Sequence, residues 1–157
     1  MIRLLFILLF LGSATIVHAQ FDIEQKLGKK IIQEKYVSFL TEKGYSPEVD
    51  TDGDIKFTYE DRTFYITIDM NDKKFFRIAK LANLELDTES QRIKAIKICH
   101  DVTRDSKVAK VYWLKNVIWT SSEILLEDQD DFKSIFDRVM KLTNDAYLKF
   151  VNVWKES

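Results

Sequence analysis

Residues 54–79, with the sequence DIKFTYEDRTFYITIDMNDKKFFRIA, decide the fold of this chain. Hydrophobic and polar side chains alternate with a period of two over residues 54–60 and 63–70, and a third hydrophobic run covers residues 74–79. The short polar breaks between these runs have the length of hairpin loops. This stretch therefore predicts three antiparallel strands that follow one another in a meander.

A long amphipathic helix is expected before the meander, over residues 22–43. Its hydrophobic side chains recur at helical spacing: Ile23, Leu27, Ile31, Ile32, Tyr36, Phe39 and Leu40. Gly44 follows in the position where a left-handed residue ends many helices, and Pro47 cannot continue one. The chain therefore leaves this helix and enters the sheet within a few residues.

A second helix, a hairpin and a third helix are expected after the meander. Thr88 and Gln91 have the spacing of a capping box, which marks the start of a helix. The stripe of this helix comprises Ile93, Ile96, Cys99, His100 and Val102. Two strands are expected at about residues 107–115 and 117–126. Three aspartates then suit the N-terminus of a last helix, whose hydrophobic stripe spans residues 132–154.

These elements predict an α+β domain in the order α-β-β-β-α-β-β-α, with helices packed on an antiparallel sheet of about five strands. The chain has 46% hydrophobic and 13% aromatic residues, which is enough for a packed core. Its 24 Lys and Arg residues nearly balance 25 Asp and Glu residues, and no basic block stands out. Nucleic acid is therefore not an expected partner.

The start of the chain predicts export. Arg3 precedes an uninterrupted hydrophobic run over residues 4–11, and small residues occupy the two positions that a signal peptidase reads, the second of them Ala19. We expect residues 1–19 to be a cleaved signal peptide and residues 20–157 to form one domain, in the periplasm or outside the cell. No stable membrane insertion is expected after cleavage, because no second hydrophobic run of spanning length follows.

Residue types that are common in catalytic sites are sparse after the signal. Cys99 and His100 are the single cysteine and the single histidine of residues 20–157, and neighbours on a helix do not face each other. Cys99 is expected to be a buried, unreactive thiol. There is no G-x-S-x-G motif and no glycine-rich phosphate loop. The sequence therefore predicts no catalytic residue, no metal site and no cofactor, and hydrolysis by paired carboxylates alone is the remaining enzymatic alternative.

The acidic segment from Glu48 to Asp54 partly matches a calcium-binding loop. Its acidic residues fall at positions one, three and five and Gly53 at position six, but Tyr59 stands where such a loop needs a bidentate glutamate. An Asp-Gly hairpin turn with carboxylates that face the solvent is the favoured interpretation. Weak calcium binding is left open.

The aromatic residues predict a hydrophobic patch on the side of the sheet away from the helices. If Phe64 and Ile66 face the helices, Tyr65, which lies between them on the strand, points the other way. In the last hairpin, both faces carry hydrophobic side chains. The predicted binding patch comprises Tyr65, Phe75, Tyr112, Leu114 and Trp119. Such a patch needs a partner, unless the last helix covers it or the assumed alternation is wrong by one residue.

The order of the elements and residues 44–57, which begin with GYSP and end with DGDIKF, resemble the YbjN family, whose members have a type III secretion chaperone-like fold. The run AKVY at residues 109–112, before a hairpin and a closing helix, is also similar in layout. The resemblance covers most of the chain after the signal. It implies a non-enzymatic, often dimeric module that binds proteins.

We therefore expect an exported module that binds a protein partner or a second copy of itself, as a homodimer, through the patch or the first helix. The alternative is a carrier of a small molecule or lipid, with aromatic side chains lining a cleft between the sheet and the helices. A dimer would bury about 800 Å² per subunit, whereas a carrier would keep a concave, hydrophobic pocket in the monomer.

Overall fold

The computed structural model describes the backbone of residues 2–156 and the side chains of residues 20 and 23–156. Its elements are α1 (Ile2–Glu42), β1 (Glu48–Val49), β2 (Ile55–Tyr59), β3 (Arg62–Thr67), β4 (Phe75–Asn83), α2 (Glu89–Asp105), β5 (Ala109–Leu114), β6 (Val117–Leu125), a 3-10 turn (Gln129–Asp131) and α3 (Phe132–Glu156). The α+β class and the order of elements are confirmed, with β1 added. The side chains of the predicted signal, residues 1–19, lie outside the described residues.

The six strands form one antiparallel sheet in the order β1-β2-β3-β4-β6-β5. The run β2-β3-β4 is the predicted meander. The sheet has one strand more than expected, because Glu48 and Val49 pair with β2 across the Asp-Gly turn. β4 also continues past its predicted end at Ala79, since all of its residues from Phe75 to Asn83 pair with β6.

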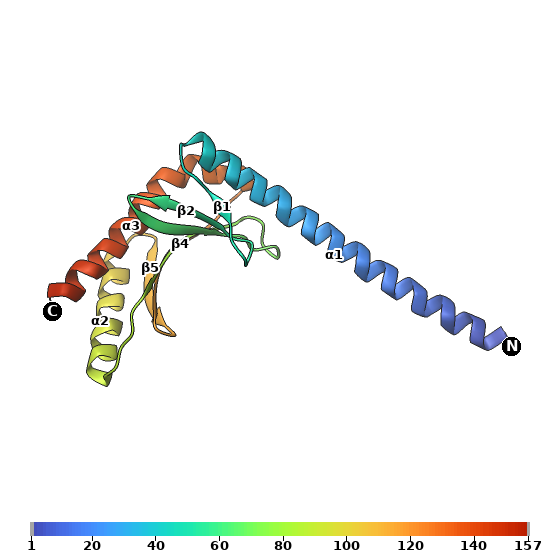
Figure 1. Cartoon of the computed structure of the whole chain (residues 1–157), viewed down its shortest axis with the longest axis horizontal. Coiled ribbons are helices and arrows are strands. Elements are labelled where there is room, and N and C mark those ends of the chain that lie inside the picture. The colour runs from blue at the N-terminus through green and yellow to red at the C-terminus, as the bar shows by residue number, and fades with distance from the viewer. Residues whose placement is uncertain (1, 157) are drawn as a thin grey trace.

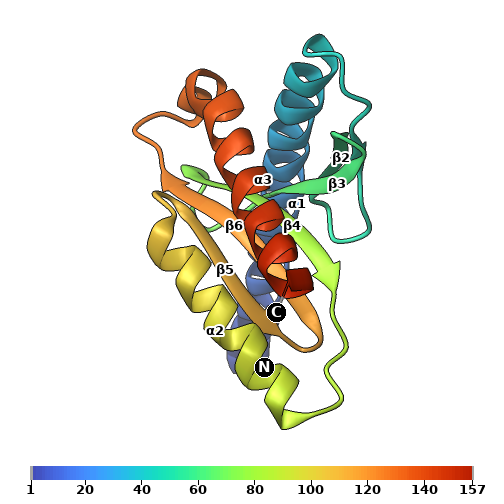
Figure 2. The ribbon, with the colours of Figure 1, turned by 90° about the vertical axis from the view of Figure 1, so that its left-hand side faces the viewer.

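The helices cover one face of the sheet. α2 and α3 lie in front of it in Figure 2, and the C-terminal half of α1 packs on the same side. The ring of Tyr36 in α1 lies 4.7 Å from Phe132 of α3 and 6.1 Å from Phe76 of β4, measured between centroids. A second cluster joins α2, β5 and the end of α3, with Val102 and Phe150 buried in it. These two clusters form the hydrophobic core.

The N-terminal half of α1 extends well beyond the rest of the molecule (Figure 1). Gly28 lies beside the side chains of Met70 and Lys73 in the loop after β3, where the helix leaves the domain. Three residues that we expected in the core stripe are therefore more than half exposed: Ile23, Leu27 and Ile31. Among the described side chains of α1, the buried stripe starts only at Ile32 and continues with Tyr36 and Leu40. Among the described residues, no helix is long and hydrophobic enough to cross a membrane.

α2 turns only part of the predicted stripe, Cys99 and Val102, to the core. Its buried residues are Ala95, Ile98, Cys99 and Val102. Ile93 and Ile96 are 60% and 55% exposed, and His100 is exposed as well. The prediction was wrong for these three because α2 packs at the margin of the sheet, where only a narrow stripe meets β5 and α3.

Candidate functional site

The predicted patch residues all lie on the face of the sheet away from the helices, which we call the open face. Their strand neighbours are buried on the helix side: Phe64, Ile66, Phe76, Val111 and Ile118. Since successive side chains of a strand point to opposite faces, the patch residues point away from the helices. The assumed alternation is correct, and α3 packs on the other side of the sheet.

Tyr112 and Trp119 form the hydrophobic centre of the open face. They are direct partners in the β5–β6 register, and their rings stack with centroids 6.1 Å apart and planes 5° apart. Leu114 lies two residues further along β5, opposite Val117. Tyr112 is 37% exposed and Leu114 is 50% exposed. Three of the five predicted residues therefore lie together at one end of the sheet.

Phe75 lies at the other end of the open face, opposite Leu125 of β6. The guanidinium of Arg77 sits over its ring, 5.0 Å from the ring centroid. Phe75 is therefore separated from the stacked pair, and the structure divides the predicted patch into two parts.

A charged cluster occupies the middle of the open face. Glu123 accepts a hydrogen bond from the Lys110 ammonium at 2.6 Å, and its other oxygen lies 3.4 Å from Nε of Arg77. Partial burial raises the pKa of Glu123, but the two cations outweigh this effect and hold the pKa below its ordinary value. The carboxylate therefore stays ionised, and the open face carries both signs of charge beside its hydrophobic end.

Tyr65 and Trp119 line a hollow of about 410 Å³ on the open face. Its floor is formed by Ala79, whose small side chain is 1% exposed, and Leu81 stands beside it. The loop that joins β1 to β2 forms one wall. The sequence prediction missed Leu81 because it ended the strand at Ala79. Continuing the alternation by two residues would have placed Leu81 on the open face.

The acidic loop is an ordered turn. A carboxylate oxygen of Asp50 accepts hydrogen bonds from the backbone N–H groups of Asp52 and Asp54, each at 2.9 Å. A carboxylate oxygen of Asp54 accepts one from the N–H of Ile68 at 3.0 Å. The predicted hairpin turn is confirmed, but these two carboxylates hold the backbone and do not simply face the solvent. Among the described side chains, no three His, Cys, Asp or Glu residues gather as metal ligands would.

Cys99 is buried in the second core cluster, as the sequence suggested, and 4% of it is exposed. Burial raises the pKa of its thiol to about 11, and a backbone hydrogen bond offsets only part of that effect. Its neighbour His100 is exposed to solvent. Because a nucleophilic cysteine needs a lowered pKa and an adjacent base, this pair lacks the geometry of a catalytic thiol.

Large aromatic side chains fill the space between the sheet and the helices. The rings of Phe57, Phe64, Phe76, Phe132 and Phe136 are at most 2% exposed. Neighbouring rings are in contact, with centroids of Phe76 and Phe132 5.7 Å apart and of Phe57 and Phe136 6.1 Å apart. These aromatic residues form the packed core, so they do not line the cleft that the carrier alternative requires.

Comparisons with known proteins support the fold. No family model matches the chain, and no curated protein sequence matches it. The structure is similar to that of YbjN from E. coli, described as a candidate transcription regulator, with a TM-score of 0.57 and 9% identity over 74% of this chain and 88% of that one. An uncharacterized protein from Methanothermobacter thermautotrophicus is similar with a TM-score of 0.57 and 15% identity, over 80% and 97% of the two chains. The chain therefore has a YbjN-like fold.

Proposed function

We propose that this chain is an exported, non-enzymatic assembly module that forms a homodimer through its open face. The proposal rests on the stacked pair Tyr112–Trp119 and its neighbour Leu114, which form an accessible hydrophobic surface on the sheet. Removing such a surface from water is favourable, so a contiguous patch of this kind favours a protein partner. Membership of the YbjN family, which the sequence resemblance implies, would fit a dimeric protein-binding module.

A second copy of the chain is a suitable partner for this surface. In a two-fold dimer the same surface meets its own copy, and the cluster of Lys110, Glu123 and Arg77 offers both signs of charge to pair across such an interface. The N-terminal part of α1 recedes behind the sheet in Figure 2, on the side of the open face. Its exposed stripe, from Ile23 to Ile31, would add to the roughly 800 Å² per subunit that a stable dimer buries.

Light scattering after size-exclusion chromatography, over a range of concentrations, tests this function. We expect the exported protein to be a dimer and Tyr112→Glu to weaken the dimer at least about 30-fold, because a charge would be buried at the centre of the contact. Tyr112 is exposed at the edge strand, so the variant should keep the circular dichroism spectrum of the wild type.

Ile93→Glu is the matched control, because Ile93 is an exposed hydrophobic residue on α2, away from the open face. This variant should dimerise like the wild type. A wild-type protein that stays monomeric at high concentration would contradict the homodimer. Equal weakening by both variants would contradict the open face as the contact surface.

A further inference from the structure

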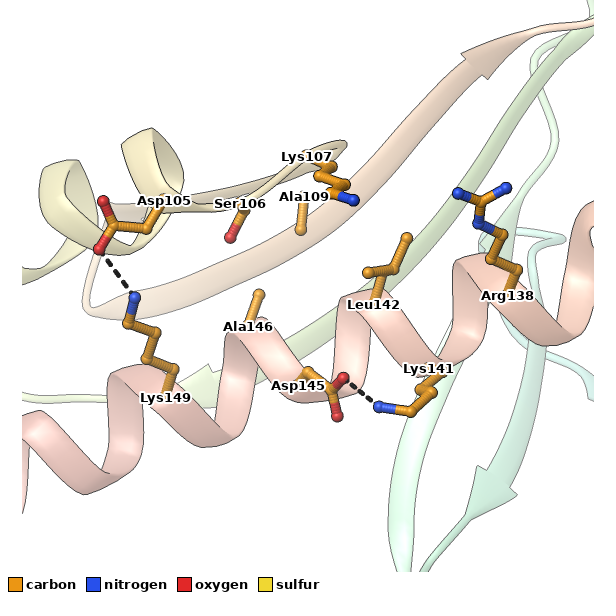
Figure 3. A pocket seen from close by; sticks show the side chains of 10 residues that line it. All are labelled: Asp105, Ser106, Lys107, Ala109, Arg138, Lys141, Leu142, Asp145, Ala146 and Lys149. Carbon is orange, nitrogen blue, oxygen red and sulfur yellow. Dashed lines mark hydrogen bonds and ion pairs between the residues drawn. The ribbon is translucent and has the colours of Figure 1, made fainter.

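A second hollow, of about 500 Å³, lies on the helix side of the molecule (Figure 3). It is bounded by α3 and by the segment that connects α2 to β5. Ala109, Leu142 and Ala146 provide hydrophobic wall, and charged side chains stand around them. Its volume falls in the range of small-molecule sites in proteins. Neither the open face nor the proposed dimer uses this hollow.

A smaller hydrophobic hollow, of about 280 Å³, adjoins the first. It is lined by the aliphatic side chains of Val108, Ile124, Ile135 and Val139. Lys107, Arg138 and Leu142 line both hollows, and Figure 3 shows Leu142 between the two cationic side chains. The two hollows therefore form one groove along α3, with a hydrophobic end and a cationic end.

Positive charge dominates the cationic end, although the whole chain has a net charge of −1. Four basic residues line it, namely Lys107, Arg138, Lys141 and Lys149, against the two acidic residues Asp105 and Asp145. Both carboxylates are already paired, Asp105 with Lys149 at 2.8 Å and Asp145 with Lys141. Among the described residues, no ion pair involves Lys107 or Arg138. These two cations are therefore available to a ligand at the junction of the two hollows.

We propose that this groove binds an amphipathic anion, a molecule with an aliphatic chain and one carboxylate. The aliphatic chain lies in the hydrophobic end, where burial removes it from water. The carboxylate accepts hydrogen bonds from the guanidinium of Arg138, whose planar fork matches carboxylate geometry, and from the ammonium of Lys107. A purely hydrophobic ligand would leave both cations without an anionic partner, and a small inorganic anion would leave the hydrophobic end empty.

Isothermal titration calorimetry of the purified protein tests the proposal with three probes: octanoate, 1-octanol and inorganic phosphate. We expect octanoate to bind at least about tenfold more tightly than either of the others, because only octanoate supplies both the chain and the charge. Absence of octanoate binding would overturn the proposal. Binding of 1-octanol or of phosphate as tight as that of octanoate would overturn it as well, since one half of the groove would then have no role.

Arg138→Gln and Lys107→Gln locate the site. Both side chains are exposed at the rim, so we expect each variant to fold and to bind octanoate about tenfold more weakly than the wild type. Lys133→Gln is the control, because Lys133 is an exposed cation of α3 that does not line the groove. If Arg138→Gln and Lys107→Gln bind octanoate as tightly as Lys133→Gln does, the groove is not the binding site.

Discussion

At the scale of single residues, two buried groups make folding sensitive to alkaline pH. Burial raises the pKa of Tyr36 from 10.0 to about 12, with a smaller contribution from Asp130, and burial also raises that of Cys99 from 9.0 to about 11. The unfolded chain loses these protons at lower pH than the folded chain does. The contribution of the two neutral groups to the free energy of unfolding is therefore fully present below their ordinary pKa values. This contribution is lost as the pH rises through the higher pKa values that the groups have in the folded chain.

The variant Tyr36→Phe tests this effect. It keeps the ring that packs between Phe76 and Phe132 but removes the proton. Between pH 9 and pH 12, we expect the free energy of unfolding to fall by about 2 kcal/mol less in the variant than in the wild type. Urea denaturation followed by tryptophan fluorescence at several pH values measures the difference.

The wild type is the reference for this measurement. If Tyr36→Phe loses as much stability as the wild type over this pH range, ionisation of Tyr36 is not linked to unfolding.

At the scale of elements, α2 protects the exposed edge of the sheet. β5 is an edge strand, and unpaired backbone groups on such a strand invite aggregation. The hydroxyl of Thr103 accepts a hydrogen bond from the N–H of Val111 at 2.8 Å and donates one to its carbonyl at 3.1 Å. One side chain of α2 therefore satisfies both backbone groups of Val111 and ties the helix to the sheet.

Thr103→Val removes this hydroxyl and keeps the shape of the side chain. We expect the free energy of unfolding to fall by about 1 to 3 kcal/mol, because two partly buried backbone groups lose their partner. Chemical denaturation measures the loss, and turbidity at elevated temperature should rise as the edge becomes accessible. Thr103→Ser, which retains the hydroxyl, should lie close to the wild type, and a Thr103→Ser protein as unstable as Thr103→Val would contradict this account.

The local elements were largely predictable because their signals are local. The capping box of Thr88 and Gln91 is present in the structure, with both of its reciprocal hydrogen bonds. Gly44 has a φ of 86°, the left-handed value that its place after α1 suggested. β1 was not predictable, since two residues carry no periodicity and become a strand only by pairing with β2.

At the scale of the whole molecule, the proposed export would determine where α1 begins. If the signal is removed, the exported chain starts at Gln20 and α1 keeps only its C-terminal half. We expect intact-mass spectrometry of protein secreted by a bacterial host to give the mass of residues 20–157. Ala19→Glu should block this cleavage, because the peptidase requires a small side chain at that position.

His18→Gln controls for the substitution itself, because the peptidase does not read the position between its two small residues. This variant should be cleaved like the wild type. Secreted protein that still carries residues 1–19 would contradict the signal peptide and leave α1 in its full length.

The sequence predicted which face of the sheet carries the candidate site, but it did not predict the shape of that site. The alternation of β3 and β6 placed Tyr65 and Trp119 on the open face correctly. No local signal indicated that Ala79 would form the floor of a hollow between them, or that Glu123 and its cations would separate Phe75 from the stacked pair. These features depend on the register of β4 with β6, which joins residues far apart in the sequence.

The sequence by itself determined the α+β class, the meander, the helix caps and the face of the sheet that each patch residue occupies. These properties follow from the periods of helix and strand, which are set by local backbone geometry. Only the tertiary structure decided that Ile32 is buried while Ile31 is exposed, that Tyr112 stacks on Trp119, and that Lys107 and Arg138 line the same groove. Burial and contact depend on which distant segment packs against a given face, and no local pattern encodes that choice.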